Sequence, residues 1–363
     1  MTATVTSALI LSAALAGQPG GAGQRPLSPA EVAKLESKHL SNIRQVTFGF
    51  FKAGEAYFSP DGERIVFQAV PGLPETAFLK PKANQFDYQI FMVDLKPGAK
   101  PTMISTGEGA CTCAYFAPDG QSLIYASTHL NPTPPEARGG DGRYNWSFPE
   151  GMDIFHVGLD GKDPRRLTDA NGYDAEGSYS PDGKHIVFTS FRDADGDGEI
   201  YVMDADGANP RRITHAKGYD GGPFFSPDGK KIIYRSDRKG NDLLQLFIND
   251  VEGTDERQLT DDESVNWCPY FFPDSKHVVY ATSRHSPANF ELYLMNVETG
   301  AEERLTFHSG FDGLPVFSPD GKKLMWTSNG RGPDRNGADR NSQIFIADFT
   351  LDPAPEPGAT SKP

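Results

Sequence analysis

The stretch DADGDGEIYVMD, which begins at Asp193, has the residue spacing of a calcium-binding loop. Asp193, Asp195 and Asp197 match the first, third and fifth positions of such a loop, Gly198 matches the sixth, and Glu199 would offer its carbonyl from the seventh. The twelfth position is an aspartate instead of the usual glutamate, and Asp and Gly are also common turn residues. The stretch therefore predicts either a Ca²⁺ site or a plain turn, and no other cofactor is expected.

Two further stretches carry side chains suited to binding. The segment THLNPTPPEARGGDGRYNWSFPEGM holds Tyr144, Trp146 and Phe148, whose rings could stack on a sugar or clamp a peptide, or could pack the loop against its neighbours. The segment NGRGPDRNGADRNSQ holds three arginines in an otherwise acidic protein, and these could bind a carboxylate or remain solvated. The three arginines are Arg331, Arg335 and Arg340.

The elements that position these loops are written six times in the chain. The segment YSPDGKHIVFTS has five near copies, and its last four versions recur every 46 residues. Self-similarity at such a period indicates a repeat architecture. Ser-Pro-Asp-Gly suits a type I turn, and the β-branched run after it predicts a strand buried on both faces. With the strand before the turn, a third strand and a short outer strand such as RRLT, each unit has the four strands of a propeller blade.

The outer-strand motif also occurs six times, each time ending 13 residues before a turn proline. The first copy, Arg44–Thr47, precedes the first blade, and the last blade has no outer strand of its own. We therefore expect Arg44–Thr47 to pair with Ile344–Asp348 and close the ring, which would remove the open sheet edges. The predicted fold is an all-β, six-bladed propeller of four-stranded blades.

The repeat GYDAEGSYSPDGKHIVFTSFRDADGDGEIYVMDADGANPRRIT resembles that of the TolB-type β-propellers, which are related to WD40-like and PD40 repeats. The resemblance covers roughly residues 40 to 350. It implies a propeller of the kind found in the periplasmic Tol–Pal component TolB and in prolyl-oligopeptidase-family peptidases. TolB carries a separate N-terminal α/β domain, whereas the short stretch here predicts one helix with Ser28 as N-cap, Pro29 at N1 and Glu31 at N3. No Gly-x-Ser-x-Gly elbow occurs, which argues against a peptidase.

The repeat is interrupted at one kind of place. The second strand reaches the third in 12 residues in blades 3 to 5, but in 23, 29 and 18 residues in blades 1, 2 and 6. Blades 6, 1 and 2 are neighbours in a closed ring, so their long loops should form one wall. Antiparallel strand order places the Ser-Pro-Asp-Gly turns on one face of the disc, the turn face. It places the long loops on the other, the long-loop face, and function is expected there.

Inner-strand positions near the long-loop face carry carboxylates and thiols. Six residues before the turn serine, the recurring aspartates either join a binding site or cap backbone amides in the links between blades. Four residues before it, two glutamates break the repeat and are stronger candidates, whereas Cys113 and Cys268 are expected to be packed small residues. The candidate carboxylates are Glu55, Glu176, Asp174, Asp220 and Asp312.

Composition limits the remaining possibilities. The 363 residues carry a formal net charge of −14, which argues against nucleic acid as a partner. Residues 1–16 contain a short apolar run that ends in a small-x-small pattern. They predict a signal peptide and a periplasmic or secreted protein without a transmembrane segment. Residues 17–43 are expected to form a linker and the short helix, residues 44–351 the propeller, and residues 352–363 a disordered Pro-rich tail. A monomer is expected.

The function predicted from the sequence is that of a TolB-like, non-catalytic scaffold. It would bind a protein, peptide or glycan of the cell envelope on its long-loop face, perhaps within a Tol–Pal-like system. The alternative is a carbohydrate-active enzyme, a lyase or glycosidase, that uses the carboxylates at the channel mouth. A carboxylate pair with a raised pKa would favour the enzyme.

Overall fold

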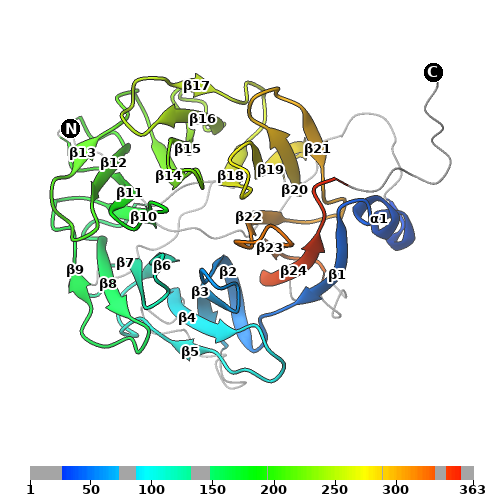
Figure 1. Ribbon diagram of the computed structural model, residues 1–363, viewed down its shortest axis with the longest axis horizontal. Coiled ribbons are helices and arrows are strands. Elements are labelled where there is room, and N and C mark those ends of the chain that lie inside the picture. Colours follow the sequence, from blue (N-terminus) through cyan, green and yellow to red (C-terminus); the bar gives the residue numbers. More distant parts are fainter. Residues whose placement is uncertain are drawn as a thin grey trace.

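Six four-stranded antiparallel sheets surround a central axis like the blades of a propeller (Figure 1). The computed structural model describes residues 27–72, 87–131, 148–193, 195–287, 289–331 and 341–352. Within these ranges no helix is long and apolar enough to cross a membrane. The predicted six-bladed, all-β architecture is confirmed.

The first three blades each consist of four strands that are consecutive in the chain. Blade 1 contains β2 (Phe50–Phe58), β3 (Arg64–Pro71), β4 (Gln89–Asp94) and β5 (Thr102–Met103). Blade 2 contains β6 (Cys111–Phe116), β7 (Ser122–Ser127), β8 (Asp153–Gly158) and β9 (Arg165–Arg166). Blade 3 contains β10 (Asp174–Tyr179), β11 (His185–Ser190), β12 (Glu199–Asp204) and β13 (Arg211–Arg212).

The remaining blades repeat this order until the last one, which recruits the first strand of the chain. Blade 4 contains β14 (Asp220–Phe225), β15 (Lys231–Ser236), β16 (Gln245–Asp250) and β17 (Arg257–Gln258). Blade 5 contains β18 (Asn266–Phe271), β19 (His277–Ser286), β20 (Asn289–Asn296) and β21 (Glu302–Arg304). Blade 6 contains β22 (Asp312–Phe317), β23 (Lys323–Ser328), β24 (Gln343–Phe349) and β1 (Leu40–Gln45).

The ring closes as the count of outer strands predicts. Strand β1 pairs antiparallel with β24, with Arg44 opposite Ile346 and Gln45 opposite Phe345. The Val46 amide continues the ladder by donating to the Ile344 carbonyl (2.9 Å). The strand begins at Leu40, four residues before the predicted Arg44. Blade 6 is therefore held together by segments some 300 residues apart in the chain.

The Ser-Pro-Asp-Gly motif recurs because each of its residues closes the same turn. In blade 3 the Gly183 amide donates to the Ser180 carbonyl (2.9 Å) and Gly183 has a φ of 71°, a conformation that favours glycine. The Ser180 hydroxyl donates to the Asp182 carboxylate (2.7 Å) and accepts from the His185 amide (3.0 Å). The turn thus satisfies its own polar groups and requires no ligand.

A hydroxyl at the end of each outer-strand motif explains why that motif ends in Thr or Ser. In blade 3 the Thr214 hydroxyl accepts from the Ile200 amide (2.9 Å), and in blade 6 Thr47 accepts from Ile344 (2.9 Å). The same bond recurs in the other four blades, with distances of 2.9 to 3.0 Å. The hydroxyl supplies a partner to a buried amide beyond the short outer strand.

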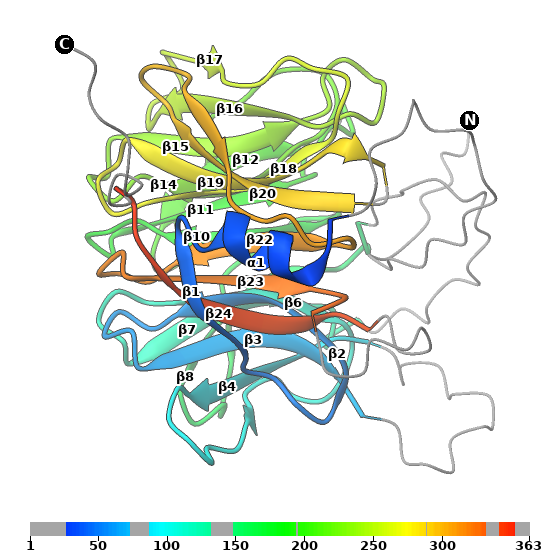
Figure 2. The same cartoon turned by 90° about the vertical axis from the view of Figure 1, so that its right-hand side faces the viewer.

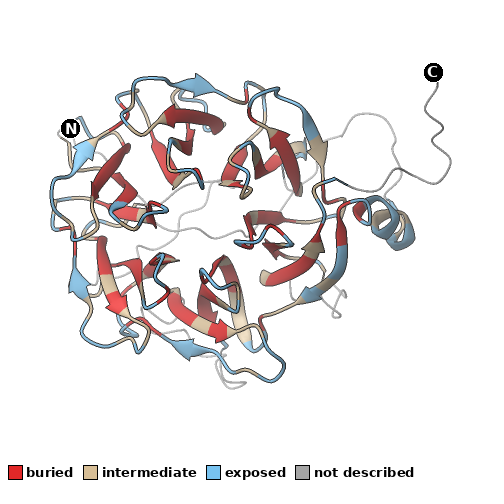
Figure 3. Cartoon of the chain, in the orientation of Figure 1, coloured by how far each residue is buried: buried red, intermediate tan, exposed pale blue. Residues whose placement is uncertain are grey.

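The core lies within and between the blades, where second and third strands are buried on both faces (Figure 3). In blade 3, Ile186, Val187 and Phe188 are fully buried, as expected for a strand that packs against its own blade and the next one. The short outer strands and the turns are exposed. This scaffold is rigid enough to fix the geometry of side chains that point into the channel.

Helix α1 (Pro29–Glu36) lies against the rim of the propeller beside β1 (Figures 1 and 2). Its predicted cap is confirmed, because Ser28 and Glu31 form a reciprocal capping box and Pro29 occupies the first turn. At its other end the buried Glu36 accepts from both terminal nitrogens of Arg331 and from the Phe307 amide (3.0 Å). The helix is thereby fixed to blades 5 and 6.

Candidate functional site: the central channel

Each inner strand contains one β-bulge, where its register with the second strand shifts. The residue at the bulge has a positive φ in every blade, between 45° and 59°. These six residues are called the bulge ring: Glu55, Cys113, Glu176, Gly222, Cys268 and Leu314. A bulge turns its extra residue away from the regular alternation of the strand and re-aims its side chain.

The side chains of the bulge ring face one another across the channel. Burial, and then the charges of Glu55 and Glu176, raise the pKa of the Cys113 thiol, although the three residues belong to three different blades. Both Cys113 and Cys268 are buried, as the sequence predicts. The ring shares no residue type from blade to blade, in contrast to the turns and the core strands.

Glu176 is the most completely bonded member of the ring. Its carboxylate accepts from Arg235 (2.6 Å), from the Tyr219 hydroxyl (2.7 Å) and from the Thr189 hydroxyl (2.8 Å). The Gly222 amide of the next blade also donates to it (2.8 Å). Arg235 in turn donates to the Tyr219 hydroxyl (2.7 Å), so the charged pair is enclosed in a network that bridges blades 3 and 4.

The glycine at position 222 makes room for the Arg235 guanidinium. A Cβ at Gly222 would lie 1.7 Å from the guanidinium nitrogen Nη1, so no other residue fits while Arg235 holds this position. Our sequence analysis missed Arg235. The available signal was a charge inside a buried strand, because KIIYRS carries arginine where the other second strands carry Thr, Ala or Gln. Arg235 is only 8% exposed in its side chain.

Glu55 has a different environment from Glu176. The Tyr57 hydroxyl donates to its carboxylate at 3.2 Å, and within the described part of the chain it forms no ion pair. Burial raises the pKa of Glu55 and the charge of Glu176 raises it further, while contacts with Cys113, Arg235 and Tyr57 oppose the rise. The two glutamates of the ring are therefore one carboxylate fixed by an arginine and one whose charge is poorly compensated.

Below the bulge ring, toward the turn face, four aromatic side chains close the axis. This aromatic layer consists of Tyr57, Tyr115, Phe224 and Tyr270. The Tyr115 and Tyr270 hydroxyls, from opposite blades, are 3.1 Å apart. Tyr57 packs on Tyr115 and Phe224 packs on Tyr270, with ring centroids 5.1 and 5.0 Å apart.

A small cavity lies between the bulge ring and the aromatic layer. It encloses about 210 Å³, including the part open to solvent, and Glu55, Cys268 and Leu314 line it from the ring. Tyr57, Phe224 and Tyr270 line it from the aromatic layer. Glu176 is not among the lining residues, so the predicted pocket that includes both glutamates is found for Glu55 alone.

The recurring aspartates of the inner strands are buried and paired instead of facing the channel. Asp174 accepts from Ser190 (2.5 Å) and Arg192 (3.0 Å), and burial raises the pKa of its carboxyl. Arg238 donates to Asp220 (3.3 Å), whose pKa burial raises to about 6. Neither carboxylate is more than 1% exposed. The expectation of backbone capping is replaced by side-chain pairing.

Asp312 follows the same pattern at the junction with blade 6. It is 1% exposed and accepts from Trp326 (3.2 Å) and from Arg331 (2.9 Å). Arg331, proposed from the sequence as a ligand-binding arginine, is 7% exposed and already holds Asp312 and Glu36 together. The glycines and aspartates around it suggested a solvated loop, but its partner on α1 lies 295 residues away in the sequence.

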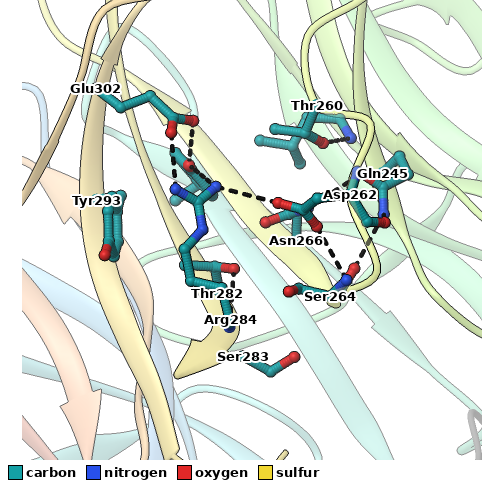
Figure 4. Close-up of polar contacts among 12 residues, drawn as sticks. Gln245, Thr260, Asp262, Ser264, Asn266, Thr282, Ser283, Arg284, Tyr293 and Glu302 are labelled. Atoms are coloured by element: carbon teal, nitrogen blue, oxygen red, sulfur yellow. Dashed lines mark hydrogen bonds and ion pairs between the residues drawn. The ribbon is translucent and has the colours of Figure 1, made fainter. Parts of the chain in front are cut away.

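The junction between blades 4 and 5 shows an uncharged version of this arrangement (Figure 4). Asn266 replaces the aspartate and donates to Gln245 (3.1 Å), which stands where blades 3 and 5 carry Glu199 and Glu291. The nearby Arg284 pairs with Asp262 (3.2 Å) and Glu302 (2.7 Å). Because amides replace acids here without loss of the blade geometry, the buried aspartates have a structural role.

The calcium-like loop is bound by an arginine. Arg212 donates to Asp193 (2.6 Å), Asp195 (3.1 Å) and Glu199, so one guanidinium occupies the space between three carboxylates. Within the described residues, no three His, Cys, Asp or Glu side chains are grouped to hold a metal ion. Asp197 lies in the same turn, where its amide donates to Asp195 (3.3 Å). The geometry gives no support to Ca²⁺ binding, which stays a prediction for titration.

Of the aromatic candidates, Phe148 lies within the described residues. Its ring packs on Phe191 (4.4 Å between centroids), on Tyr219 (4.9 Å) and on Tyr173 (5.2 Å). This is the packing alternative, and it places Phe148 over the Tyr219 that holds Glu176. The candidates Tyr144, Trp146, Arg335 and Arg340 lie outside the described residues, as does most of each long loop.

Comparison with known proteins agrees with this architecture. Residues 147–245 match the Tricorn protease N-terminal beta propeller domain, and residues 241–350 match the TolB beta propeller domain. The chain is a TolB-like six-bladed β-propeller with PD40 repeats.

Similar solved structures include two TolB proteins and an enzyme. A putative TolB from Agrobacterium tumefaciens is 21% identical with a TM-score of 0.57, over 82% of this chain and 91% of that one. TolB from Acinetobacter baumannii is 19% identical with a TM-score of 0.53, over 86% and 79%. An oligogalacturonate lyase from Vibrio parahaemolyticus is 12% identical with a TM-score of 0.50, over 84% and 93%. At these identities the likeness concerns the fold alone.

Proposed function

We propose that the protein is a non-catalytic scaffold of the cell envelope that binds its ligand at the central channel, from the long-loop face. The ligand would be a protein, a peptide or a glycan. The observation that carries the proposal is the bulge ring, because the repeat is kept wherever blades are built and abandoned where side chains face the channel. A position that served only the fold would be expected to repeat like the turn or the outer-strand hydroxyl.

The direction of approach follows from the aromatic layer. Tyr115 and Tyr270 meet across the axis, so the channel is closed between the bulge ring and the turn face. The turns themselves bond their own polar groups and offer few free side chains. A ligand that reaches Glu55 would therefore enter from the long-loop face.

The proposal is tested by screening peptide and glycan arrays and comparing variants on the hits. Leu314→Phe adds a ring to a side chain that lines the cavity and should weaken the binding of a channel ligand at least 10-fold. Lys184→Ala alters an exposed residue of the turn face and should leave binding unchanged. Thermal unfolding of both variants controls for folding. If Leu314→Phe folds and binds every hit as wild type does, the channel is not the binding site.

A second candidate function rests on the contrast between the two glutamates. Pairs of carboxyl groups whose environments separate their pKa values are typical of acid–base catalysis, and the pKa of Glu55 is raised. An enzyme that cleaves a polysaccharide could use Glu55 as acid and Glu176 as the fixed carboxylate. Against it, four donors already saturate Glu176. A panel of acidic and neutral polysaccharides, assayed with wild type and Glu55→Gln, decides: turnover that Glu55→Gln abolishes would favour the enzyme.

A further inference from the structure

The channel cavity has the lining of a site for a small cation. Three aromatic side chains, Tyr57, Phe224 and Tyr270, lie on one side of it and the Glu55 carboxylate lies on the other. Aromatic faces attract cations through their ring quadrupole, and more strongly where water is excluded. A carboxylate beside such faces adds the charge that a neutral ligand would leave unpaired.

The charges around the cavity are unbalanced. Glu176 has Arg235 as its partner at 2.6 Å, and that guanidinium also bonds Tyr219. Glu55 accepts the Tyr57 hydroxyl and, among the described residues, has no ion-pair partner of its own. A buried carboxylate is stabilised by a hydrogen-bonded cation, so the channel lacks one positive charge when Glu55 is ionised.

We propose that this cavity receives the ammonium group of a lysine side chain from a protein or peptide ligand. The proposal rests on the proposed function and names the chemistry of its ligand. The free centre of the cavity admits a group about the size of a water molecule. A lysine ammonium is compact and stands on a thin four-carbon stem, whereas a guanidinium is wider and planar. The ammonium of an amino sugar is attached directly to a ring, which is too wide to follow it.

This inference has a consequence for protons. Because burial raises the pKa of Glu55, part of the ligand-free protein carries a proton there. An ammonium group beside the carboxylate favours its charged form, so binding should release that proton. Affinity should therefore increase as pH rises through the range in which Glu55 ionises, while the lysine stays charged. Arg235, Glu176 and the thiols of Cys113 and Cys268 also face Glu55, so the pH profile must be compared with that of Glu55→Gln.

The test uses the pentapeptide Gly-Gly-Lys-Gly-Gly, its acetyl-lysine form, and glucosamine, titrated by ligand-observed NMR. Wild type should bind the lysine peptide at least 10-fold more tightly than the acetylated peptide or glucosamine. Glu55→Gln, which keeps the shape of the side chain, should lose at least 10-fold in affinity and the pH dependence. Asp182→Asn, an exposed substitution on the turn face, should bind as wild type does.

Three results would overturn the proposal. These are equal binding of the acetylated peptide, stronger binding of glucosamine, or undiminished binding by a folded Glu55→Gln. Tyr270→Leu, which removes one aromatic wall, gives a second variant and should also weaken the lysine peptide. If lysine fails while array hits still lose affinity in Leu314→Phe, the scaffold function stands and the cation site falls.

Discussion

Buried charges in this propeller are paired by residues from neighbouring blades. Arg235 and Glu176 are about 10% exposed and lie in blades 4 and 3. A buried ion pair contributes little compared with apolar residues of similar size, but removing one partner strands the other charge. The pair is therefore better evidence for a specific arrangement of the channel than for stability.

The first prediction concerns this pair. Arg235→Met should lower the free energy of unfolding by about 3–5 kcal/mol, because it leaves the Glu176 carboxylate buried without its cation. Urea denaturation measures the loss. Arg211→Met is the matched control, because Arg211 pairs with Glu252 on the surface, and it should change stability by less than about 1 kcal/mol. Equal losses in the two variants would mean that Arg235 is not the buried partner of Glu176.

The second prediction concerns the acids at the blade junctions. Burial raises the pKa of Glu199 to about 7, and the charge of Asp220 raises it further, although Thr214 and Arg212 oppose the rise. Because the folded state then binds more protons than the unfolded chain between about pH 4.5 and 7, this group makes the protein less stable as pH rises through that window.

The measurement is the difference in unfolding free energy between wild type and Glu199→Gln at several pH values. Comparing the two proteins cancels the contribution of buried histidines such as His285, whose pKa is lowered and whose effect has the opposite sign. Wild type should lose up to about 1.4 kcal/mol per pH unit relative to the variant between pH 5 and 7. A difference that does not change with pH would contradict the raised pKa.

At the scale of elements, the inner-strand bulge could not be predicted from the sequence. A positive φ is usually signalled by Gly or Asn, but only Gly222 among the six bulge residues is of this kind. For the others the left-handed conformation costs about 1–2 kcal/mol. The fold imposes it because the inner strand must turn its side chains into the channel. Counting back from the turn nevertheless located these positions correctly as channel-facing.

The third prediction concerns helix α1 and its fixation to the propeller. Arg331→Met leaves Glu36 and Asp312 buried without a cation and should cost about 3–5 kcal/mol in unfolding free energy. It should also make the chain before β1 sensitive to proteases. Lys38→Met removes an exposed ion pair with Glu303 from the same segment and should have little effect on either measurement. Protease resistance equal to wild type in a folded Arg331→Met would show that other contacts hold the helix.

At the scale of the whole molecule, the architecture was readable because it is periodic. Turn prolines and outer-strand hydroxyls occur once per blade, so their equal numbers predicted that β1 completes blade 6. The pairing of Arg331 with Glu36 has no such period, and neither does that of Arg235 with Glu176. Long-range pairs between unlike segments leave no repeated mark in the sequence, which is why the ring closure was predicted and the channel network was not.

The central claim is that ligand contacts concentrate at the bulge ring. Hydrogen exchange of backbone amides, measured with and without a ligand selected from the arrays, tests it without any substitution. Binding at the channel should slow exchange in the inner strands, above all around Glu55, Gly222 and Cys268, while amides of the Ser-Pro-Asp-Gly turns exchange as before. Slowed exchange confined to those turns or to the outer strands, with the inner strands unaffected, would contradict the account.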